Sequence, residues 1–446
     1  MNEPKLDKVV VVGASMGGLL AARVLSESFH KVVILERDPI VDQAISRKGQ
    51  PQTRHGHGLL ARGTEILSEY FPQIVDELEE GGAVVADFGD SMRWYTHGGY
   101  RERLHYGSDA VISTRPFLEQ TVRRRVAQLP NVEFRDNCAV SSLVTNDANT
   151  QVLGVELVDR SANNRPESLL VDLVVDTTGR GTQVGKWLDQ MGYEKPEVES
   201  VDIDLAYVTR EFKRDASAEG SREWIFVTPE APGEKHLGAA FPVEQDRWIV
   251  SLAGWHGDHA PTDSDGFEQF AKKLPARDIY KVVTENEALT EPVKYKFPSN
   301  LRRRYEKLER FPDGLLVMAD AVCSFNPTLG QGMTVSGMQS IVLRDFIAKY
   351  QDESVRNPKK YFREIAKVVD IPWQLATGED FRYAETHGKK PFGTDMVNSY
   401  VTKVQKTTLT DPKVTASFLD VMNLTSKPTS LFRPATVKRV LLPSKG

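Results

Sequence analysis

Small residues and an acid near the N-terminus have the types and spacing that bind a dinucleotide. Gly13, Ser15 and Gly17 occupy alternate positions, and Glu36 follows Gly13 by 23 residues. Residues without a large side chain let backbone N–H groups approach a pyrophosphate, and an acid at this distance accepts hydrogen bonds from ribose hydroxyls. Ser15 replaces the middle glycine of the usual fingerprint, but serine is small enough for a close approach. We predict a dinucleotide site here; the alternative is a strand–helix–strand unit without a ligand.

A second group of residues, far along the chain, also has the chemistry of a cofactor site. Asp320 follows a buried strand at 315–318, and a loop with Pro327 leads to Gly330 and Gly332 at the start of a long helix. The acid can hold a ribitol or ribose hydroxyl, and the glycines expose N–H groups that favour negative charge. Reduced flavin carries negative charge, whereas a nicotinamide enzyme needs no second anchor of this kind. The two groups together therefore indicate FAD rather than NAD.

The polar loop at 38–58 carries a concentration of basic side chains. Arg47, Lys48, Arg54, His55 and His57 lie within 11 residues of one another. The two histidines are metal-ligand types, but no neighbouring Cys, Asp or Glu completes a ligand set, so we predict no metal. A positive loop beside a phosphate-rich cofactor is favoured over a loop that is merely solvated.

Strands and helices must bring these residues together. Arg115 begins a helix with Thr114 as its N-cap, although an arginine at this place opposes the helix dipole and indicates either a local anion or a solvated side chain. Residues 201–255 alternate in polarity like an antiparallel sheet, and residues 91–107 resemble a hairpin that leaves the first domain. The expected parallel strands are 9–12, 31–35, 169–176 and 315–318.

Composition excludes several other classes of protein. The chain has 446 residues, a net charge of −5 and only two cysteines, Cys138 and Cys323. This charge does not favour a nucleic-acid partner, and the cysteine spacing fits no metal motif. Neither an N-terminal leader nor a run of 18 apolar residues is present, so we expect a cytoplasmic enzyme with no transmembrane segment.

The two groups of residues also carry a family resemblance. The pattern GxxxxG…Glu-Arg followed by Asp-Ala…Asn-Pro…Gly-Gln-Gly resembles the FAD-dependent monooxygenases of the aromatic-hydroxylase and squalene-epoxidase superfamily. The loop at 47–57, the turn at 176–181 (Asp-Thr-Thr-Gly-Arg-Gly) and Arg247-Trp-Ile-Val are similar to the flavin epoxidases of polyether antibiotic biosynthesis. The resemblance covers most of residues 8–345 and no motif beyond them.

The resemblance implies an α/β fold: a discontinuous Rossmann-like FAD-binding domain with an inserted antiparallel β-sheet substrate domain and C-terminal helices. The segments implied are 1–88, 108–195 and 299–350 for the FAD domain, 89–107 and 196–298 for the substrate sheet, and 351–446 for the helical region. The expected FAD-binding residues are Gly13, Ser15, Met16, Gly17, Glu36, Arg37, Lys48, Gln52, Arg115, Asp320, Pro327, Gly330, Gly332 and Met333.

Two departures from the family pattern affect these expectations. Relatives carry Gly-Asp where this chain has Ala319-Asp320, so slight crowding is expected there. Asp176-Thr177 stands where aromatic hydroxylases have Asp-Gly, a motif linked to both FAD and NADPH use. Electrons from NAD(P)H are therefore expected either directly or through a separate flavin reductase.

The resemblance implies a monooxygenase that transfers oxygen from a flavin C4a-hydroperoxide to a lipophilic small molecule, by epoxidation or hydroxylation, as in secondary metabolism. The catalytic residues are unknown because the cofactor supplies the chemistry; Arg54 and His55 are candidates for residues near the flavin. The main alternative is a reductase of isoprenoid double bonds, similar to geranylgeranyl reductases. Halogenation is disfavoured because Trp255-His256 is followed by Gly-Asp and not by the halogenase WxWxIP motif. A flavin-stabilised binding protein without turnover is the non-enzymatic alternative.

Overall fold

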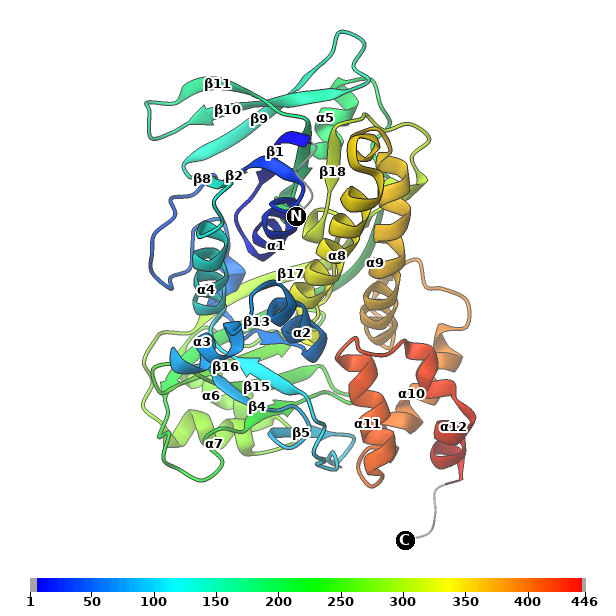
Figure 1. The fold of residues 1–446 in the computed structure, drawn as a ribbon. Helices are drawn as coiled ribbons and strands as arrows, with labels where there is room; N and C mark the ends of the chain where they lie inside the picture. The colour runs from blue at the N-terminus through cyan, green and yellow to red at the C-terminus, as the bar shows by residue number, and fades with distance from the viewer. Residues whose placement is uncertain (1–5, 443–446) are drawn as a thin grey trace.

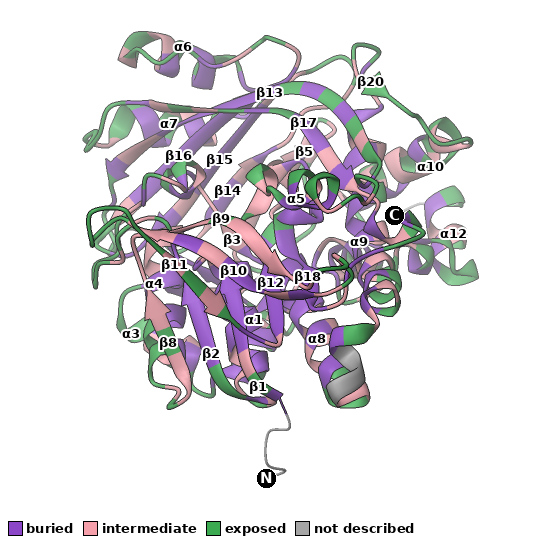
Figure 2. Ribbon diagram, turned by 90° about the horizontal axis from the view of Figure 1, so that it is seen from above, coloured by how far each residue is buried: buried purple, intermediate pink, exposed green. Residues whose placement is uncertain are grey.

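The computed structural model describes residues 6–442, except for the side chains of residues 352–354. Its centre is a five-stranded parallel sheet in which the valine-rich β1 lies in the middle. Every residue of β1 from Val9 to Val12 is buried, as a strand covered on both faces requires (Figure 2). The order of the strands is β18 (Leu315–Val317), β12 (Leu173–Asp176), β1 (Leu6–Val12), β2 (Phe29–Leu35) and β8 (Val132–Arg135).

Two layers cover this sheet (Figure 1). On one face, α1 packs against α4 and α8, while α8 also contacts α2 and α9. On the other face lies a three-stranded antiparallel sheet, β9 to β11. The bounds of these elements are α1 (Met16–Leu25), α2 (Ala61–Tyr70), α4 (Arg115–Ala127), α8 (Gly332–Tyr350), α9 (Pro358–Asp380), β9 (Cys138–Thr145), β10 (Val152–Asp159) and β11 (Arg165–Leu170).

A second, nine-stranded sheet lies below the first in Figure 1. The hairpin β5–β6 joins its edge through a parallel pairing of β5 with β14. The strands run in the order β19 (Cys323–Ser324), β17 (Val293–Arg303), β13 (Val198–Lys213), β16 (Arg247–Gly254), β15 (His236–Val243), β14 (Trp224–Val227), β5 (Met92–Thr96) and β6 (Gly99–Tyr100), and β20 (His387–Gly388) also pairs with β13.

Helices α6 (Ser264–Lys273) and α7 (Asp278–Glu285) bury a separate apolar cluster against this sheet. Helices α10 (Thr394–Thr407), α11 (Pro412–Met422) and α12 (Pro434–Leu441) form a group at the C-terminal end (Figure 1). The remaining helices and strands are α3 (Ile74–Glu80), α5 (Val184–Gln190), β3 (Gly58–Leu59), β4 (Val84–Asp87) and β7 (Asp109–Ile112). Short 3-10 helices are η1 (Pro51–Arg54), η2 (Gly179–Gly181), η3 (Tyr305–Lys307), η4 (Ala319–Ala321), η5 (Pro327–Leu329), η6 (Gln351–Arg356) and η7 (Pro428–Phe432).

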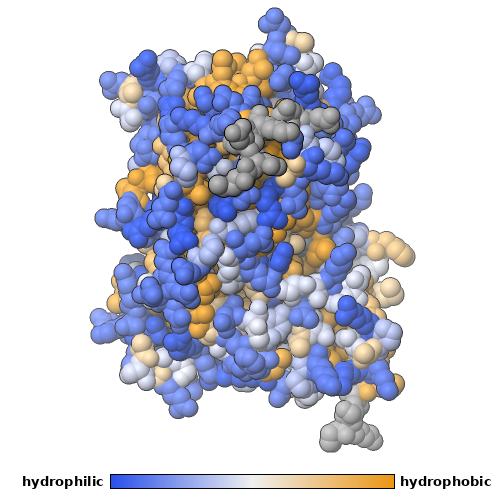
Figure 3. Space-filling view, viewed as in Figure 1, coloured by the Kyte–Doolittle hydropathy of each residue, from blue (hydrophilic) through white to orange (hydrophobic). Residues whose placement is uncertain are grey.

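This architecture confirms the predicted fold class. A parallel sheet with helices on one face, an antiparallel sheet and C-terminal helices are all present. The face shown in Figure 3 is mostly hydrophilic, with hydrophobic groups in small separate patches. Among residues 6–442, no helix combines the length and apolar character needed to cross a bilayer.

Candidate cofactor and substrate cavity

One cavity of about 950 Å³ joins the turn between β1 and α1 to the antiparallel sheet. It is lined at one end by the two predicted groups of cofactor residues, which the parallel sheet brings together because β1 and β18 both end there. The predicted residues that line it are Gly13, Ser15, Met16, Gly17, Glu36, Arg37, Gln52, Arg115, Asp320, Pro327, Gly330, Gly332 and Met333.

Three predicted residues of the basic loop lie elsewhere. Lys48 and Arg54 are exposed, and neither they nor His55 belong to the cavity lining. The buried cation of this loop is instead Arg47, whose side chain is 6% exposed. Which of two adjacent cations turns inward depends on the loop backbone, and the sequence carried no signal that separated Arg47 from Lys48.

The turn between β1 and α1 is held by close backbone contacts. Gly13 adopts φ +105°, and an added Cβ on Gly18 would lie 1.8 Å from the carbonyl oxygen of Gly13. Ser15, the N-cap of α1, makes no side-chain capping bond, and the first turn of α1 contains no acid. The first N–H groups of α1 are therefore without a side-chain partner where the helix begins at the cavity, an arrangement that suits a phosphate.

Helix α8 offers the same arrangement at the second group of residues. Its N-cap Gln331 makes no side-chain capping bond, and its first turn has no acid. An added Cβ on Gly332 would meet no heavy atom within 4 Å, although Gly332 lines the cavity. Space therefore remains for a ligand directly at the start of α8. The free N–H groups at the starts of α1 and α8, together with the space next to Gly332, fit the two halves of FAD.

Glu36 is fixed by a buried network of charges. Its Oε2 accepts a hydrogen bond from the Ala14 N–H at 3.0 Å and lies 2.8 Å from Nη1 of Arg47. Nη2 of Arg47 in turn donates to Oε1 of Glu119 at 2.6 Å. Burial lowers the pKa of Arg47, but Glu119 and Glu36 outweigh it, so that the net shift is upward. Glu36 is thus held in one orientation at the cavity, where its oxygens can accept hydrogen bonds from ribose hydroxyls.

Arg115 also belongs to this network. The Nε and Nη2 atoms of Arg115 both lie 3.3 Å from Oε2 of Glu119, which is one turn further along α4. Oγ of Ser15 donates to the same carboxylate oxygen at 3.0 Å. Burial raises the pKa of Glu119, but Arg115 and Arg47 outweigh it, and the net shift is downward. Glu119 is therefore a buried anionic partner of Arg115.

Asp320 faces the cavity from the other anchor. The residue is exposed to the cavity, but the protein around it displaces water and raises its pKa, while Arg115, Arg180 and Arg303 act in the opposite direction. Asp176, by contrast, is fully buried and accepts hydrogen bonds from Oγ1 of Thr178 at 2.7 Å and from Oγ1 of Thr182 at 2.5 Å. Asp176 therefore closes the turn around η2, and Asp320 is the carboxylate available to a ligand.

The methyl group of Ala319 packs against the start of α1. Ala319 adopts φ +58°, a region that favours glycine, and an added Cβ on Gly17 would lie 2.7 Å from the Ala319 Cβ. We expect Ala319→Gly to raise the free energy of unfolding by up to about 1 kcal/mol, since a left-handed non-glycine residue costs roughly 1–2 kcal/mol. Gly17→Ala should cost about 2 kcal/mol in the natural chain and about 1 kcal/mol less in the Ala319→Gly background. Urea denaturation of the four proteins measures this coupling, and an equal cost in both backgrounds would contradict it.

His55 and His57 lie side by side at the boundary with the antiparallel sheet. His55 is buried against Tyr207 and Tyr295, and its Nδ1 lies 2.8 Å from Oγ1 of Thr209. Burial lowers the pKa of His55 to about 3, and burial with Arg115 nearby lowers the pKa of His57 to about 4. His57 lines the cavity, and its Nδ1 lies 2.8 Å from the carbonyl oxygen of His55. That bond requires Nδ1–H, so neutral His57 keeps Nε2 as an acceptor.

The buried neutral His55 predicts acid instability. The pKa of His55 is about 3 in the folded protein and 6.5 in the unfolded chain. Neutral His55 therefore contributes fully to the free energy of unfolding above pH 6.5, and this contribution is lost as the pH falls towards 3. We expect about 2 kcal/mol of unfolding free energy to be lost through His55 between pH 7 and pH 5. Urea denaturation at both pH values should show a loss smaller by this amount in His55→Asn, whereas His30→Asn, at an exposed position on β2, should behave like the natural chain. Equal losses in His55→Asn and the natural chain would refute this.

Beyond His57 the cavity becomes an apolar chamber. Aromatic side chains of the antiparallel sheet line it together with residues of the C-terminal helices, for which the sequence suggested no role. Val397 and Phe432 are 43% and 47% exposed, so this end of the cavity reaches the surface beside α10 and η7. The apolar and aromatic lining includes Trp94, Trp224, Phe226, Leu237, Phe241, Phe297, Val397, Val401, Phe418, Val421, Met422, Leu431 and Phe432.

Asp380, at the end of α9, is a further cavity residue that sequence analysis missed. Nδ2 of Asn300 donates to its Oδ2 at 2.8 Å, and Nδ2 of Asn326 donates to its Oδ1 at 2.7 Å. Burial raises the pKa of Asp380 to about 6 against these hydrogen bonds. The carboxylate thereby joins the C-terminal helices to the loop that precedes α8.

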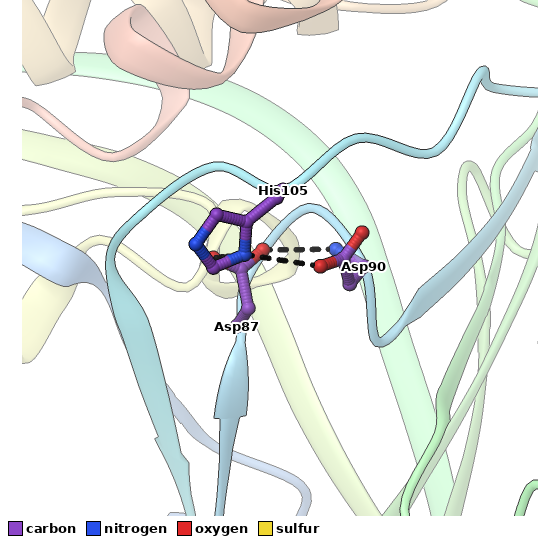
Figure 4. Close-up of side chains that lie close together, drawn as sticks. All are labelled: Asp87, Asp90 and His105. Atoms are coloured by element: carbon purple, nitrogen blue, oxygen red, sulfur yellow. Dashed lines mark hydrogen bonds and ion pairs between the residues drawn. The ribbon is translucent and has the colours of Figure 1, made fainter.

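A separate cluster of Asp87, Asp90 and His105 lies outside the cavity (Figure 4). The Asp87 carboxylate accepts backbone N–H groups of Gly89, Asp90, Tyr106 and Gly107. The side chain of His105 is 78% exposed and lies 3.1 Å from Asp90 Oδ2. Closure of the loops next to β4 accounts for this cluster.

Comparison with known proteins supports both the fold and a family. No family model matches the chain. Protein Rv3254 of Mycobacterium tuberculosis (strain ATCC 25618 / H37Rv) is 34% identical over 356 residues, which are 77% of this chain and 73% of the relative.

Solved structures with low sequence identity share the fold. A flavoprotein/dehydrogenase from Cytophaga hutchinsonii matches with a TM-score of 0.69 at 16% identity, covering 97% of this chain and 96% of the other. The flavin-dependent brominase Bmp2 matches with a TM-score of 0.68 at 12% identity over 97% and 96%. PqsL of Pseudomonas aeruginosa, described as a probable FAD-dependent monooxygenase, matches with a TM-score of 0.61 at 16% identity over 85% and 98%. The chain therefore belongs to the family of Protein Rv3254 and has the fold of the FAD-dependent monooxygenase superfamily.

Proposed function

We propose that this protein is an FAD-dependent monooxygenase that inserts one oxygen atom of molecular oxygen into a lipophilic small molecule. The observation that carries the proposal is one continuous cavity, which has the predicted nucleotide anchors at one end and an apolar chamber at the other. An oxygen-transferring enzyme needs a cofactor and a substrate in one space from which water is largely excluded. The product would be an epoxide or an alcohol, and the resemblance to polyether epoxidases favours the former, in secondary metabolism.

The residues divide into two groups by their expected contacts with FAD. Gly13, Ser15, Gly17 and Glu36 would hold the ADP half, with Arg115 at the pyrophosphate. Asp320 would bind the ribitol, and the N–H groups around Gly330 and Gly332 would stabilise negative charge on the ring system. When bound and reduced, FAD supplies the electrons that activate oxygen. The protein would contribute binding, orientation and the apolar chamber, and His57 offers a neutral acceptor on the cavity wall.

Electrons would come from NAD(P)H, either directly or through a separate flavin reductase. The second route is supported by the turn at Asp176, since its carboxylate is engaged by Thr178 and Thr182 and Thr177 stands in place of a glycine. Reduction of the FAD-loaded protein by NADPH, with and without an added flavin reductase, distinguishes the two routes.

Chemical reduction of the FAD-loaded protein, followed by mixing with oxygen, tests the proposed function. Oxygen consumption, peroxide release and the visible spectrum are recorded together, first alone and then with a set of alkenes and phenols. We expect rapid oxygen consumption and, with a suitable substrate, peroxide release below one equivalent because oxygen enters the product. Saturation of an isoprenoid double bond without oxygen consumption would instead establish the reductase alternative.

A further inference from the structure

Arg101 is a buried cation in the apolar chamber. It follows the hairpin β5–β6, is 7% exposed and lines the cavity among aromatic side chains. The centre of its guanidinium group lies 4.0 Å from the ring centroid of Trp94 and 4.1 Å from that of Phe418. Two aromatic rings therefore hold the group in one orientation between the sheet and α11.

The hydrogen-bonding capacity of Arg101 is only partly used. Nη1 donates to Oγ1 of Thr408 at 2.8 Å. Nε is buried without a partner, and among the described residues Nη2 donates to none. These two nitrogens lie on one edge of the guanidinium, the edge that pairs with both oxygens of a carboxylate.

No described acid lies within 4.0 Å of Arg101. Among the described acids, only the charge of Glu379 raises the pKa of Arg101 noticeably. Glu379 is already paired with Arg382 at 2.8 Å. Two other buried arginines are neutralised: Arg47 meets Glu36 and Glu119, and Arg302 lies 2.6 Å from Asp370. The buried Arg123 has no ion pair among the described residues, but its Nη2 donates to the Val41 carbonyl oxygen at 2.8 Å. Arg101 therefore differs from Arg47 and Arg302 in having a buried charge with an unsatisfied hydrogen-bonding edge.

An uncompensated buried charge is unfavourable, and burial lowers the pKa of Arg101 to about 9. The group is still protonated at pH 7. The rings of Trp94 and Phe418 stabilise the cation and Thr408 accepts one of its hydrogen bonds, but none of the three supplies a negative charge. A ligand with a negative charge would compensate the group and satisfy these hydrogen-bond donors.

We propose that Arg101 binds a carboxylate of the substrate, so that the substrate is an apolar or aromatic acid and not a neutral hydrocarbon. This inference rests on the proposed function, because it places the substrate in the chamber beyond the cofactor anchors. The partners of Arg101 belong to the hairpin and the C-terminal helices and not to the predicted cofactor residues. The charge is therefore available to the substrate.

Calorimetric titration of the FAD-loaded protein with 2-naphthoate and with its neutral methyl ester tests this assignment. We expect 2-naphthoate to bind at least about tenfold more tightly in the natural chain, and the preference to fall below about threefold in Arg101→Met. Arg103→Met is the matched control, since Arg103 lies in the same segment but is exposed and paired with Glu223; its preference should be unchanged.

Equal affinities of the natural chain for acid and ester would overturn the assignment, as would an unchanged preference in Arg101→Met. If Arg101→Met does not fold, Arg101→Lys keeps the charge but loses the two-pronged edge and should reduce the preference. Binding needs neither reduction nor oxygen, so the assignment survives if the enzyme is a reductase. The visible spectrum reports separately whether FAD is bound. If the chain does not bind FAD, the same titration of the FAD-free chain with 2-naphthoate and its ester still tests the role of Arg101.

Discussion

The variant Gly18→Ala is expected to lose at least about 4 kcal/mol of unfolding free energy, the range in which single substitutions disrupt a fold. Its Cβ would lie 1.8 Å from the Gly13 carbonyl oxygen and 2.9 Å from Oγ1 of Thr177. The first of these atoms belongs to the backbone at the end of the central strand, so the clash cannot be relieved by a change of rotamer. Urea denaturation and the yield of folded protein measure the effect. A free energy of unfolding equal to that of the natural chain would contradict the geometry of this turn.

Gly332→Ala is the matched control. Its Cβ meets no heavy atom within 4 Å, so the FAD-free protein should keep its stability. If FAD occupies the space at the start of α8, the methyl group should weaken FAD binding about tenfold, since overpacking costs roughly 1–3 kcal/mol. The two glycines therefore separate a requirement of the fold from a requirement of the cofactor.

The second large effect is expected at Glu36. In Glu36→Ala the ribose loses its acceptor, the Ala14 N–H loses its hydrogen bond, and Arg47 keeps only Glu119 as an acidic partner. Because a hydrogen bond to a charged group contributes roughly 1.5–3 kcal/mol, we expect FAD to bind about 100-fold more weakly. Titration with FAD, followed by visible absorbance, gives the dissociation constant.

Glu133→Ala provides the comparison for Glu36→Ala. Glu133 lies on the neighbouring β8 and forms an ion pair with Lys31. The side chains of both residues are about half exposed. Such pairs contribute little, so FAD affinity should be unchanged. An equal affinity for FAD in Glu36→Ala and Glu133→Ala would show that Glu36 does not contact the cofactor.

Local sequence signals predicted the elements that carry the cofactor anchors. The valines at 9–12 form the buried β1, and Thr114 caps α4 by accepting a hydrogen bond from the Phe117 N–H at 3.2 Å. One strand boundary was less accurate. The parallel strand expected at 169–176 begins at Leu173, because Leu169 and Leu170 belong to the antiparallel β11. Pairing with β10 decided this boundary.

The far end of the cavity depended on contacts that no local pattern encodes. Arg101 meets Thr408 and Phe418, which follow it by about 300 residues, and Asp380 meets Asn300 and Asn326. No spacing in the sequence relates these residues, because their proximity arises when the C-terminal helices pack against the hairpin and the sheet. The sequence therefore indicated which residues meet at one end of the cavity and left the other end undefined.

FAD binding to the purified protein is the measurement on which the whole interpretation depends. Titration of the flavin-free chain with FAD, monitored by visible absorbance and flavin fluorescence, should give one FAD for each chain, with the weakening expected for Glu36→Ala and Gly332→Ala. Failure to bind FAD, or binding that neither substitution affects, would contradict the assignment of the two anchors and with it the proposed monooxygenase.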